Sequence, residues 1–191
     1  MIYLANKEDA ARMARIHKTE IHQGFLSSLP ISFLENFYEA LILSPGSFCV
    51  VAKEVDEVVG FISGVTSLRG FYKYFLRHYF FQSFPTLLPK VFSSFKKIIE
   101  TLLYPAKEKA LPPAELLTIA VVKNFQGQGV GSQLLSVFLA EMKKRNVKEC
   151  KVLVGASLAP AIRFYEKNGF VFIKSISVHG TAVSNIYVYT L

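Results

Sequence analysis

Apolar and polar residues recur with two different periods along this chain, and the period distinguishes strands from helices. Residues 1–5 (MIYLA) predict a short strand, and apolar positions then follow helical spacing after Asn6, which can cap the first helix. A second helical pattern begins near Ser32, where Ser32 and Glu35 have the spacing of a capping box, and it ends before Ser44. Two helices are therefore expected after the first strand.

The middle of the chain changes from strand-like to irregular patterning. Residues 48–53 and 58–66 are β-branched runs separated by a short polar stretch, which predicts an antiparallel hairpin. Residues 67–113 contain eleven Phe and Tyr residues and several prolines, with helical pieces expected around 70–80 and 88–103. We interpret residues 67–113 as an insertion into a regular fold.

Regular α/β patterning resumes after the insertion. The expected order is strand 115–122, helix 130–145, strand 149–154, helix 159–167, strand 170–178 and strand 183–190. The chain has 191 residues, of which 51% are hydrophobic and 19% charged, so it is long enough and apolar enough to bury one core. We expect a single α/β (α+β) domain over residues 1–191.

Several kinds of protein are disfavoured by the composition. The amino terminus lacks the basic start and apolar centre of a secretory signal, so a cytoplasmic location is expected. Cys49 and Cys150 both lie in β-rich runs, which predicts buried free thiols, and no Cys/His cluster has the spacing of metal ligands, so no metal is expected. No apolar run is long enough to span a bilayer.

Positive charge is concentrated in the insertion. The whole chain carries a formal charge of +8, and residues 66–112 hold eight lysines and arginines but only two glutamates, a local charge of +6. Such a surface can meet the phosphates of a cofactor, a membrane surface or a nucleic acid, and charge alone does not choose among them.

Three glycines, Gly127, Gly129 and Gly131, stand two apart at the entrance of the predicted helix 130–145. Amides in the first turn of a helix have no internal partner and form an anion site, which glycines allow a phosphate to approach closely. The mononucleotide phosphate loop is excluded because its lysine is absent, and the dinucleotide fingerprint fits poorly because the third glycine comes one residue early.

The segment "QGQGVG" resembles the acyl-CoA pyrophosphate loop of the GNAT acetyltransferase superfamily, whose pattern is Arg/Gln-x-x-Gly-x-Gly/Ala. Gln126, Gly129 and Gly131 match it, and "APAIRFYEKNGF" (159–170) resembles the second signature of that superfamily. The resemblance implies a GNAT-like fold with a mixed, mostly antiparallel sheet, helices on both faces, and the insertion between the third and fourth core strands.

The resemblance also implies acetyl-CoA as cosubstrate and a set of residues that hold it. Backbone groups of three strand residues would pair with the pantetheine arm: Ile119, Ala120 and Val121. The pyrophosphate loop would comprise Gln126, Gly127, Gln128, Gly129, Val130, Gly131 and Ser132, and two side chains would line the arm: Ala161 and Phe164. The sequence departs from the family where Gln126 replaces the commoner arginine and Leu158 replaces an asparagine.

Acetyl transfer to an amine needs a group that takes the amine proton and a group that gives one to the leaving thiolate. By position in the family pattern, Glu115 is the expected base and Tyr165 the expected acid. Strand alternation would place Glu115 on the same face as Ile119. Each residue also has an alternative without a catalytic role. Glu115 can be a solvated glutamate at the start of a strand, and Tyr165 can be a tyrosine that only packs in the core.

The function expected from this resemblance is N-acetyl transfer to a primary amine of a small molecule, such as an amino sugar or a nucleotide-linked amino sugar. Protein or peptide acetylation is the alternative enzyme function, and a non-catalytic acyl-CoA sensor or membrane-surface module is the alternative class. The insertion is interpreted as an active-site lid, with peripheral membrane contact or an extra helical layer as alternatives and nucleic acid least favoured. A monomer or a homodimer is expected.

Overall fold

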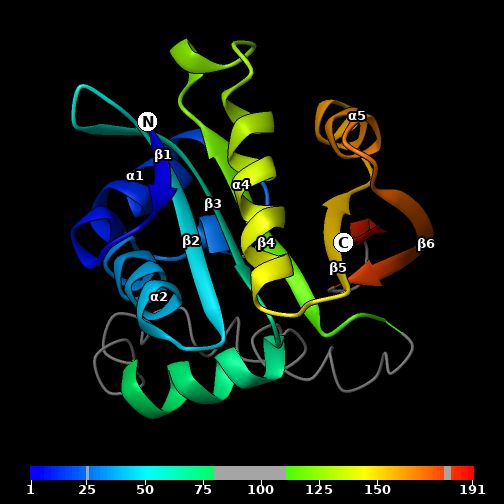
Figure 1. The fold of residues 1–191 in the computed structure, drawn as a ribbon, viewed down its shortest axis with the longest axis horizontal. Coiled ribbons are helices and arrows are strands. Elements are labelled where there is room, and N and C mark those ends of the chain that lie inside the picture. The colour runs from blue at the N-terminus through cyan, green and yellow to red at the C-terminus, as the bar shows by residue number, and fades with distance from the viewer. Residues whose placement is uncertain (25, 80–110, 179–181) are drawn as a thin grey trace.

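The computed structural model describes residues 1–24, 26–79, 111–178 and 182–191. Its strands form one seven-stranded sheet in the order β1-β2-β3-β4-β5-β7-β6 (Figure 1). The strands are β1 (Ile2–Leu4), β2 (Ser47–Glu54), β3 (Glu57–Val65), β4 (Ala114–Val121), β5 (Glu149–Gly155), β6 (Val171–Val178) and β7 (Ala182–Thr190). Among the strands of the described residues, only β4 and β5 pair in parallel, so the prediction of a mixed, mostly antiparallel sheet is confirmed.

Helices cover both faces of the sheet. They are α1 (Ala10–Glu20), α2 (Ile31–Leu43), α4 (Val130–Lys144), α5 (Ala159–Lys167) and a helix over residues 68–79. The first core layer contains α1, α2 and the 68–79 helix, and the second contains α4 and α5. Figure 1 shows α4 running along the front of the sheet. We refer to these two sides of the sheet as the α1/α2 face and the α4/α5 face.

The start of α2 differs from the sequence expectation. The helix begins at Ile31, with Pro30 as its N-cap and no capping hydrogen bond from a side chain. Proline has a fixed φ that suits the position before a helix, so Ser32 falls inside the first turn. The predicted capping box of Ser32 and Glu35 is therefore wrong, although the apolar stripe of this helix is buried as expected.

The 68–79 helix confirms the first helical piece expected in the insertion. Its buried side chains, Leu68, Phe71, Phe75 and Tyr79, belong to the core layer of α1 and α2. Phe75 packs edge-on against Phe33 of α2, with ring centroids 5.6 Å apart. The second expected piece, 88–103, lies outside the described residues. Within the part of the chain that the structure describes, no helix combines the length and apolar character needed to cross a membrane.

Strands β4 and β5 pair only over their first residues. The last pair is Leu116 with Val152, after which β4 continues beside β3 and β5 continues beside β7. The backbone edges that face each other beyond this pair, residues 117–121 and 153–155, are not joined in the sheet. The sheet is thus open between its two parallel strands, at their carboxyl ends.

A β-bulge in β4 changes which side chains share a face. Ser63 of β3 pairs with Thr118, but its neighbour Gly64 pairs with Leu116, so Leu117 is an extra residue. Leu117 packs on the α1/α2 face, whereas Leu116 and Ile119 pack on the α4/α5 face. The expectation that Glu115 and Ile119 share a face is therefore wrong, because the bulge shifts the alternation by one residue.

Candidate active site

The glycine turn between β4 and α4 leaves backbone amides without partners. Gly127 and Gly129 have φ values of 75° and 82°, a region that favours glycine. The first backbone hydrogen bond of α4 runs from the Gln133 amide to the Gly129 carbonyl at 3.0 Å. The amides of residues 130–132 therefore have no acceptor within the helix, and together with the helix dipole they form an anion site.

The two segments predicted to hold the cofactor lie against each other. A Cβ atom added at Gly131 would be 3.5 Å from the Phe164 ring, so the first turn of α4 contacts α5 directly. Ala161 and Phe164 are partly buried against the core of the α4/α5 face. Since α4 follows β4 and α5 follows β5, the anion site lies at the opening between the two parallel strands.

The glutamine side chains of the loop point back to the protein. Gln126 Nε2 donates to the Val121 carbonyl at 2.8 Å and to Glu20 Oε2 at 3.3 Å. Gln128 Nε2 donates to the Asn124 carbonyl at 2.8 Å. These bonds tie the loop to the end of β4 and to α1, so the loop's capacity for an anion comes from its backbone amides.

Tyr165 is buried on the α4/α5 face. Its ring packs edge-on against Phe164 and Phe170, with centroids 5.4 and 5.3 Å away. Burial raises the pKa of the Tyr165 hydroxyl above its ordinary value of 10.0. The hydroxyl therefore keeps its proton throughout the neutral range and can act there only as a donor of that proton or as a neutral acceptor.

Glu115 is buried in an ion pair next to the opening. Lys151 Nζ lies 3.3 Å from Glu115 Oε2 and also donates to the Pro112 carbonyl at 2.5 Å. Burial raises the pKa of the Glu115 carboxyl, and Lys151 opposes that rise. Glu115 lies on the face opposite to Ala114 and Leu116, so it is on the α1/α2 face while Tyr165 is on the other. The structure thus places the two predicted catalytic residues on opposite faces of the sheet.

A family model described as Acetyltransferase (GNAT) family matches residues 13–170. This chain belongs to the GNAT acetyltransferase family. It is similar to Ard1 from Thermoplasma volcanium, with a TM-score of 0.65 and 19% identity over 100% of this chain and 97% of that one. A Salmonella typhimurium protein solved with its cofactor acetyl-CoA gives a TM-score of 0.62 and 17% identity, over 100% and 93% of the two chains.

One stretch of this GNAT chain is more closely similar to a curated protein. The [ribosomal protein bS18]-alanine N-acetyltransferase of Escherichia coli (strain K12) is 43% identical over 60 residues. That stretch covers 31% of this chain and 40% of the relative. The solved structures share the fold of the whole chain, and the seven-stranded α+β GNAT fold expected from the sequence is confirmed.

The sequence analysis did not identify a buried polar group on the α1/α2 face. His17 Nδ1 lies 2.5 Å from the Tyr38 hydroxyl, and His17 Nε2 lies 3.1 Å from Ser27 Oγ. His17 and Tyr38 each occupy an apolar position of their helix, and both are buried. A histidine in the middle of an apolar stripe was the available signal, but the stripe alone does not show its partners.

His17 is expected to make the protein less stable in acid. Burial, and then the nearby charge of Lys18, lower the pKa of His17 from 6.5 to about 4, while Tyr38 and Ser27 face its ring from outside α1. Between those pH values the unfolded chain binds a proton that the native protein does not, so the free energy of unfolding falls as the pH falls, by up to about 3 kcal/mol.

Urea unfolding at about pH 7 and about pH 4.5 measures this contribution. His17→Gln cannot take up the proton, so the variant is expected to lose less stability between the two pH values than the wild type. Carboxylates titrate in both proteins and cancel in the comparison. An equal loss in both would show that His17 does not resist protonation.

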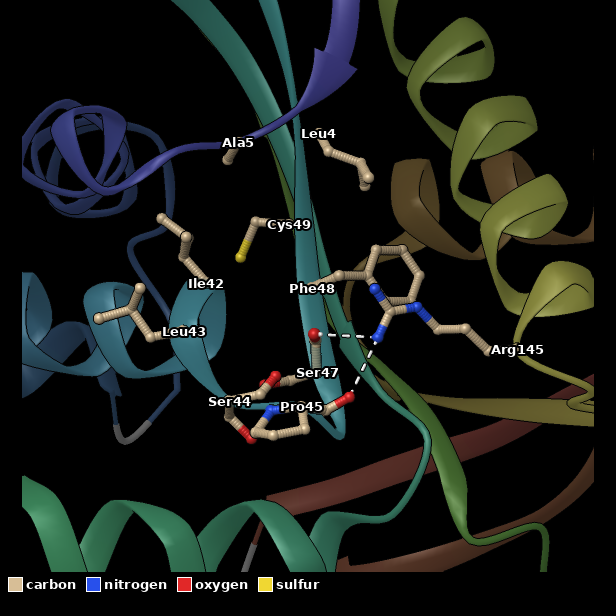
Figure 2. A pocket seen from close by; sticks show the side chains of 10 residues that line it. All are labelled: Leu4, Ala5, Ile42, Leu43, Ser44, Pro45, Ser47, Phe48, Cys49 and Arg145. Atoms are coloured by element: carbon tan, nitrogen blue, oxygen red, sulfur yellow. Dashed lines mark hydrogen bonds between the residues drawn. The ribbon is translucent and has the colours of Figure 1, made fainter.

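The pocket shown in Figure 2 is remote from the glycine turn. It has a volume of about 270 Å³ and is lined by Leu4, Ala5, Ile42, Leu43, Ser44, Pro45, Ser47, Phe48, Cys49 and Arg145. Arg145 donates to the carbonyls of Pro45 and Ser47 at 3.2 and 3.3 Å, and its guanidinium lies 4.6 Å from the centre of the Phe48 ring. Since Arg145 follows the last residue of α4, about 22 Å of helix separates this pocket from the anion site.

Neither cysteine forms a disulfide, and both Cys49 and Cys150 are buried free thiols, as predicted. Among the described residues, no group of three or more His, Cys, Asp or Glu side chains is placed to hold a metal ion.

Proposed function

We propose that this protein is an acetyl-CoA-dependent N-acetyltransferase that transfers the acetyl group to a primary amine by direct attack. The observation that carries the proposal is the position of the unpartnered α4 amides, against Phe164 and at the opening between β4 and β5. A phosphate group and an extended arm need such an arrangement: donors at one end and a free strand edge beside it.

We assign the contacts with acetyl-CoA to the residues predicted for the cofactor. In the proposal, the amides from Gly127 to Ser132 hold the pyrophosphate, and no Cβ atom covers the glycine positions. The edge of residues 119–121 is not paired with β5, so its backbone groups can pair with the amides of the pantetheine arm. Ala161 and Phe164 supply the apolar wall on the α5 side.

Glu115 and Tyr165 remain the proposed acid–base pair. A buried carboxyl with a raised pKa is better matched to accepting a proton near neutral pH than an exposed one. A tyrosine that keeps its proton can donate it, or a hydrogen bond, to the leaving thiolate. Their placement on opposite faces suits a reaction in which the amine and the thioester approach the opening from opposite sides.

We propose a small-molecule amine as the acceptor class, on the ground that an inserted lid suits the enclosure of a compact substrate. Most of that insertion, residues 80–110, lies outside the described residues. The second candidate is the amino group of a protein, which the similarity to the bS18-alanine N-acetyltransferase favours. Thiol release with a panel of amino sugars, polyamines and amino-terminal peptides separates the two classes.

Calorimetric titration with acetyl-CoA tests the cofactor site, with adenosine 3′,5′-bisphosphate and ATP as controls. Acetyl-CoA is expected to bind more tightly than either control. In Gly129→Ala, the side chain would strain a backbone at φ 82° and enter the phosphate site, so acetyl-CoA affinity is expected to fall about 10-fold or more.

Gly24→Ala is the matched control, because Gly24 also has a positive φ, 102°, and open space around it but lies outside the glycine turn. It imposes a comparable backbone strain and is expected to leave acetyl-CoA affinity unchanged. Equal affinities for the wild type and Gly129→Ala would remove the pyrophosphate assignment.

A further inference from the structure

Lys151 is a buried lysine next to the point where the two parallel strands separate. It lies on β5 opposite Glu115 of β4, and this pair is the last but one before the strands diverge. Its neighbours Cys150 and Val152 belong to the core of the α4/α5 face. Because side chains alternate along a strand, Lys151 lies on the α1/α2 face, as Glu115 does. Lys151 is only 4% exposed, and a lysine is rarely buried to that extent without a partner.

Two acceptors fix the ammonium group of Lys151. Its Nζ lies 3.3 Å from Glu115 Oε2 and donates to the Pro112 carbonyl at 2.5 Å. Pro112 and Pro113 lead into β4, and the Pro113 carbonyl accepts from the Leu68 amide at 3.3 Å. The backbone that holds Lys151 is therefore itself tied to the start of the 68–79 helix. With both contacts in place, the ammonium group has a fixed position beside the carboxylate.

The other titratable groups near this pair are neutral around pH 7. Burial, and then the charge of Glu115, raise the pKa of the Tyr72 hydroxyl, which comes from the 68–79 helix. Burial raises the pKa of the Cys150 thiol on β5 to about 12, although the charge of Lys151 opposes that rise. Lys151 thus supplies the positive charge that faces the Glu115 carboxylate.

A buried ion pair of this kind affects proton binding more than it affects stability. Both charges lose their water on burial, which offsets much of their attraction. Burial favours the protonated form of Glu115, whereas the ammonium group of Lys151 favours the carboxylate. A carboxylate that stays ionised in a buried position is suited to act as a general base.

We propose that Lys151 is the positioning residue for the base: its ammonium group holds Glu115 Oε2 next to the opening and supplies the counter-charge that keeps the carboxylate ionised until it takes up the amine proton. The inference rests on the proposed N-acetyltransferase function and on Glu115 as its base. In this step the amine nitrogen forms a bond to the thioester carbonyl carbon and passes one proton to Glu115, while Lys151 keeps its three protons. The bond between that carbon and sulfur then breaks, and Tyr165 gives the thiolate a proton.

Lys151→Met and Lys151→Arg form a matched pair for the test, because only arginine keeps the charge. In Lys151→Met, the acidic limb of kcat/KM for the amine is expected to move up by about 1 to 3 pH units, since Glu115 then binds its proton more tightly. At about pH 7 its kcat/KM is expected to fall about 10-fold or more and to recover as the pH is raised. The limb of Lys151→Arg is expected to stay close to that of the wild type. The amine itself titrates identically in all three assays.

Lys53→Met is the control, because Lys53 Nζ lies 2.7 Å from Asp9, another buried carboxylate outside the opening. It is expected to disturb a buried ion pair without moving the acidic limb. A limb that keeps its wild-type position in Lys151→Met would overturn the inference, and so would an equal shift in Lys53→Met. Wild-type turnover would leave the proposed function standing in both cases.

NMR of the free wild-type protein tests the pairing without any turnover and without a substitution. The carbon signal of the Glu115 carboxyl and the nitrogen signal of Lys151 Nζ are expected to titrate together, at the pH of the acidic limb of kcat/KM. A Lys151 signal that does not follow the titration of Glu115 would overturn the inference even if the enzyme is active. Absence of amine-dependent thiol release in the wild type would instead remove the proposed function, and the role of Lys151 with it.

Discussion

Tyr165→Phe is expected to lower kcat for acetyl transfer by about 10²- to 10³-fold and to leave acetyl-CoA affinity nearly unchanged. The substitution removes only the hydroxyl, and the packing of the ring against Phe164 and Phe170 is retained. Because the hydroxyl is proposed to stabilise the leaving thiolate, the loss should shrink with acyl donors whose thiol is more acidic. Steady-state thiol release with such a series of donors measures this dependence.

Tyr79→Phe is the control for Tyr165. Tyr79 is also a buried tyrosine, and its hydroxyl donates to Glu39 Oε1 at 3.1 Å, away from the opening. A similar loss of kcat in both variants would indicate a general effect of removing a buried hydroxyl. A loss at Tyr165 that does not vary with the acidity of the thiol would argue against its role as the acid.

Glu115→Gln is expected to lower kcat/KM for the amine by about 10²- to 10³-fold. A base must be deprotonated to act, so wild-type activity should rise with pH through the raised pKa of Glu115, and the variant should lack that limb. The same raised pKa means that the native protein holds this proton more tightly than the unfolded chain. Its contribution to stability is therefore present at low pH and is lost as the pH rises through the native pKa.

Glu115→Gln also disturbs the buried ion pair with Lys151. Its control must therefore remove a buried carboxylate from an ion pair in another part of the protein. Asp9 is buried and lies 2.7 Å from Lys53 Nζ, which makes Asp9→Asn a matched change outside the opening. The two variants are expected to lose stability alike but to differ in activity and in the pH profile. If Glu115→Gln keeps the wild-type acidic limb, another group is the base.

Local patterns in the sequence were sufficient for most of the fold. Outside the insertion, the strands and most helices were predicted within two residues, because the apolar period extends over a whole element. The exception is α1, which begins at Ala10 after a short 3-10 turn and not directly after Asn6. The hairpin between β2 and β3 and the glycine turn were also predicted, because each depends on residues that are adjacent in the sequence. The start of α2 was misplaced because Pro30 and Ser32 both suit a helix start, and composition does not rank them.

The bulge in β4 could not be predicted, because Leu117 is apolar and can pack on either face. An inserted residue of that kind leaves no mark on the hydrophobic pattern, and only its partner strand shows the shift. The prediction that Glu115 and Ile119 lie on the same face of the strand was wrong for this reason alone.

The glycine turn was predicted more fully than the buried polar groups near the opening. Its residues are contiguous and obey helix-terminus physics, whereas Lys151 and Glu115 are 36 positions apart, and the hydrogen-bonded residues His17, Tyr38 and Ser27 come from three separate segments. Pairings over such distances arise from the tertiary structure. The cofactor-binding residues, the roles of Glu115 and Tyr165 and the single-domain organisation remain predictions.

The extra residue Leu117 shifts the alternation of side chains between the two faces of β4 by one position. Glu115 and Thr118 are three positions apart, an odd number that would put them on opposite sides of an unbroken strand. Counting one additional step brings both to the α1/α2 face, while Ile119 and Val121 lie on the α4/α5 face. In the proposed reaction, one short strand therefore serves two substrates at once, one on each side of the sheet.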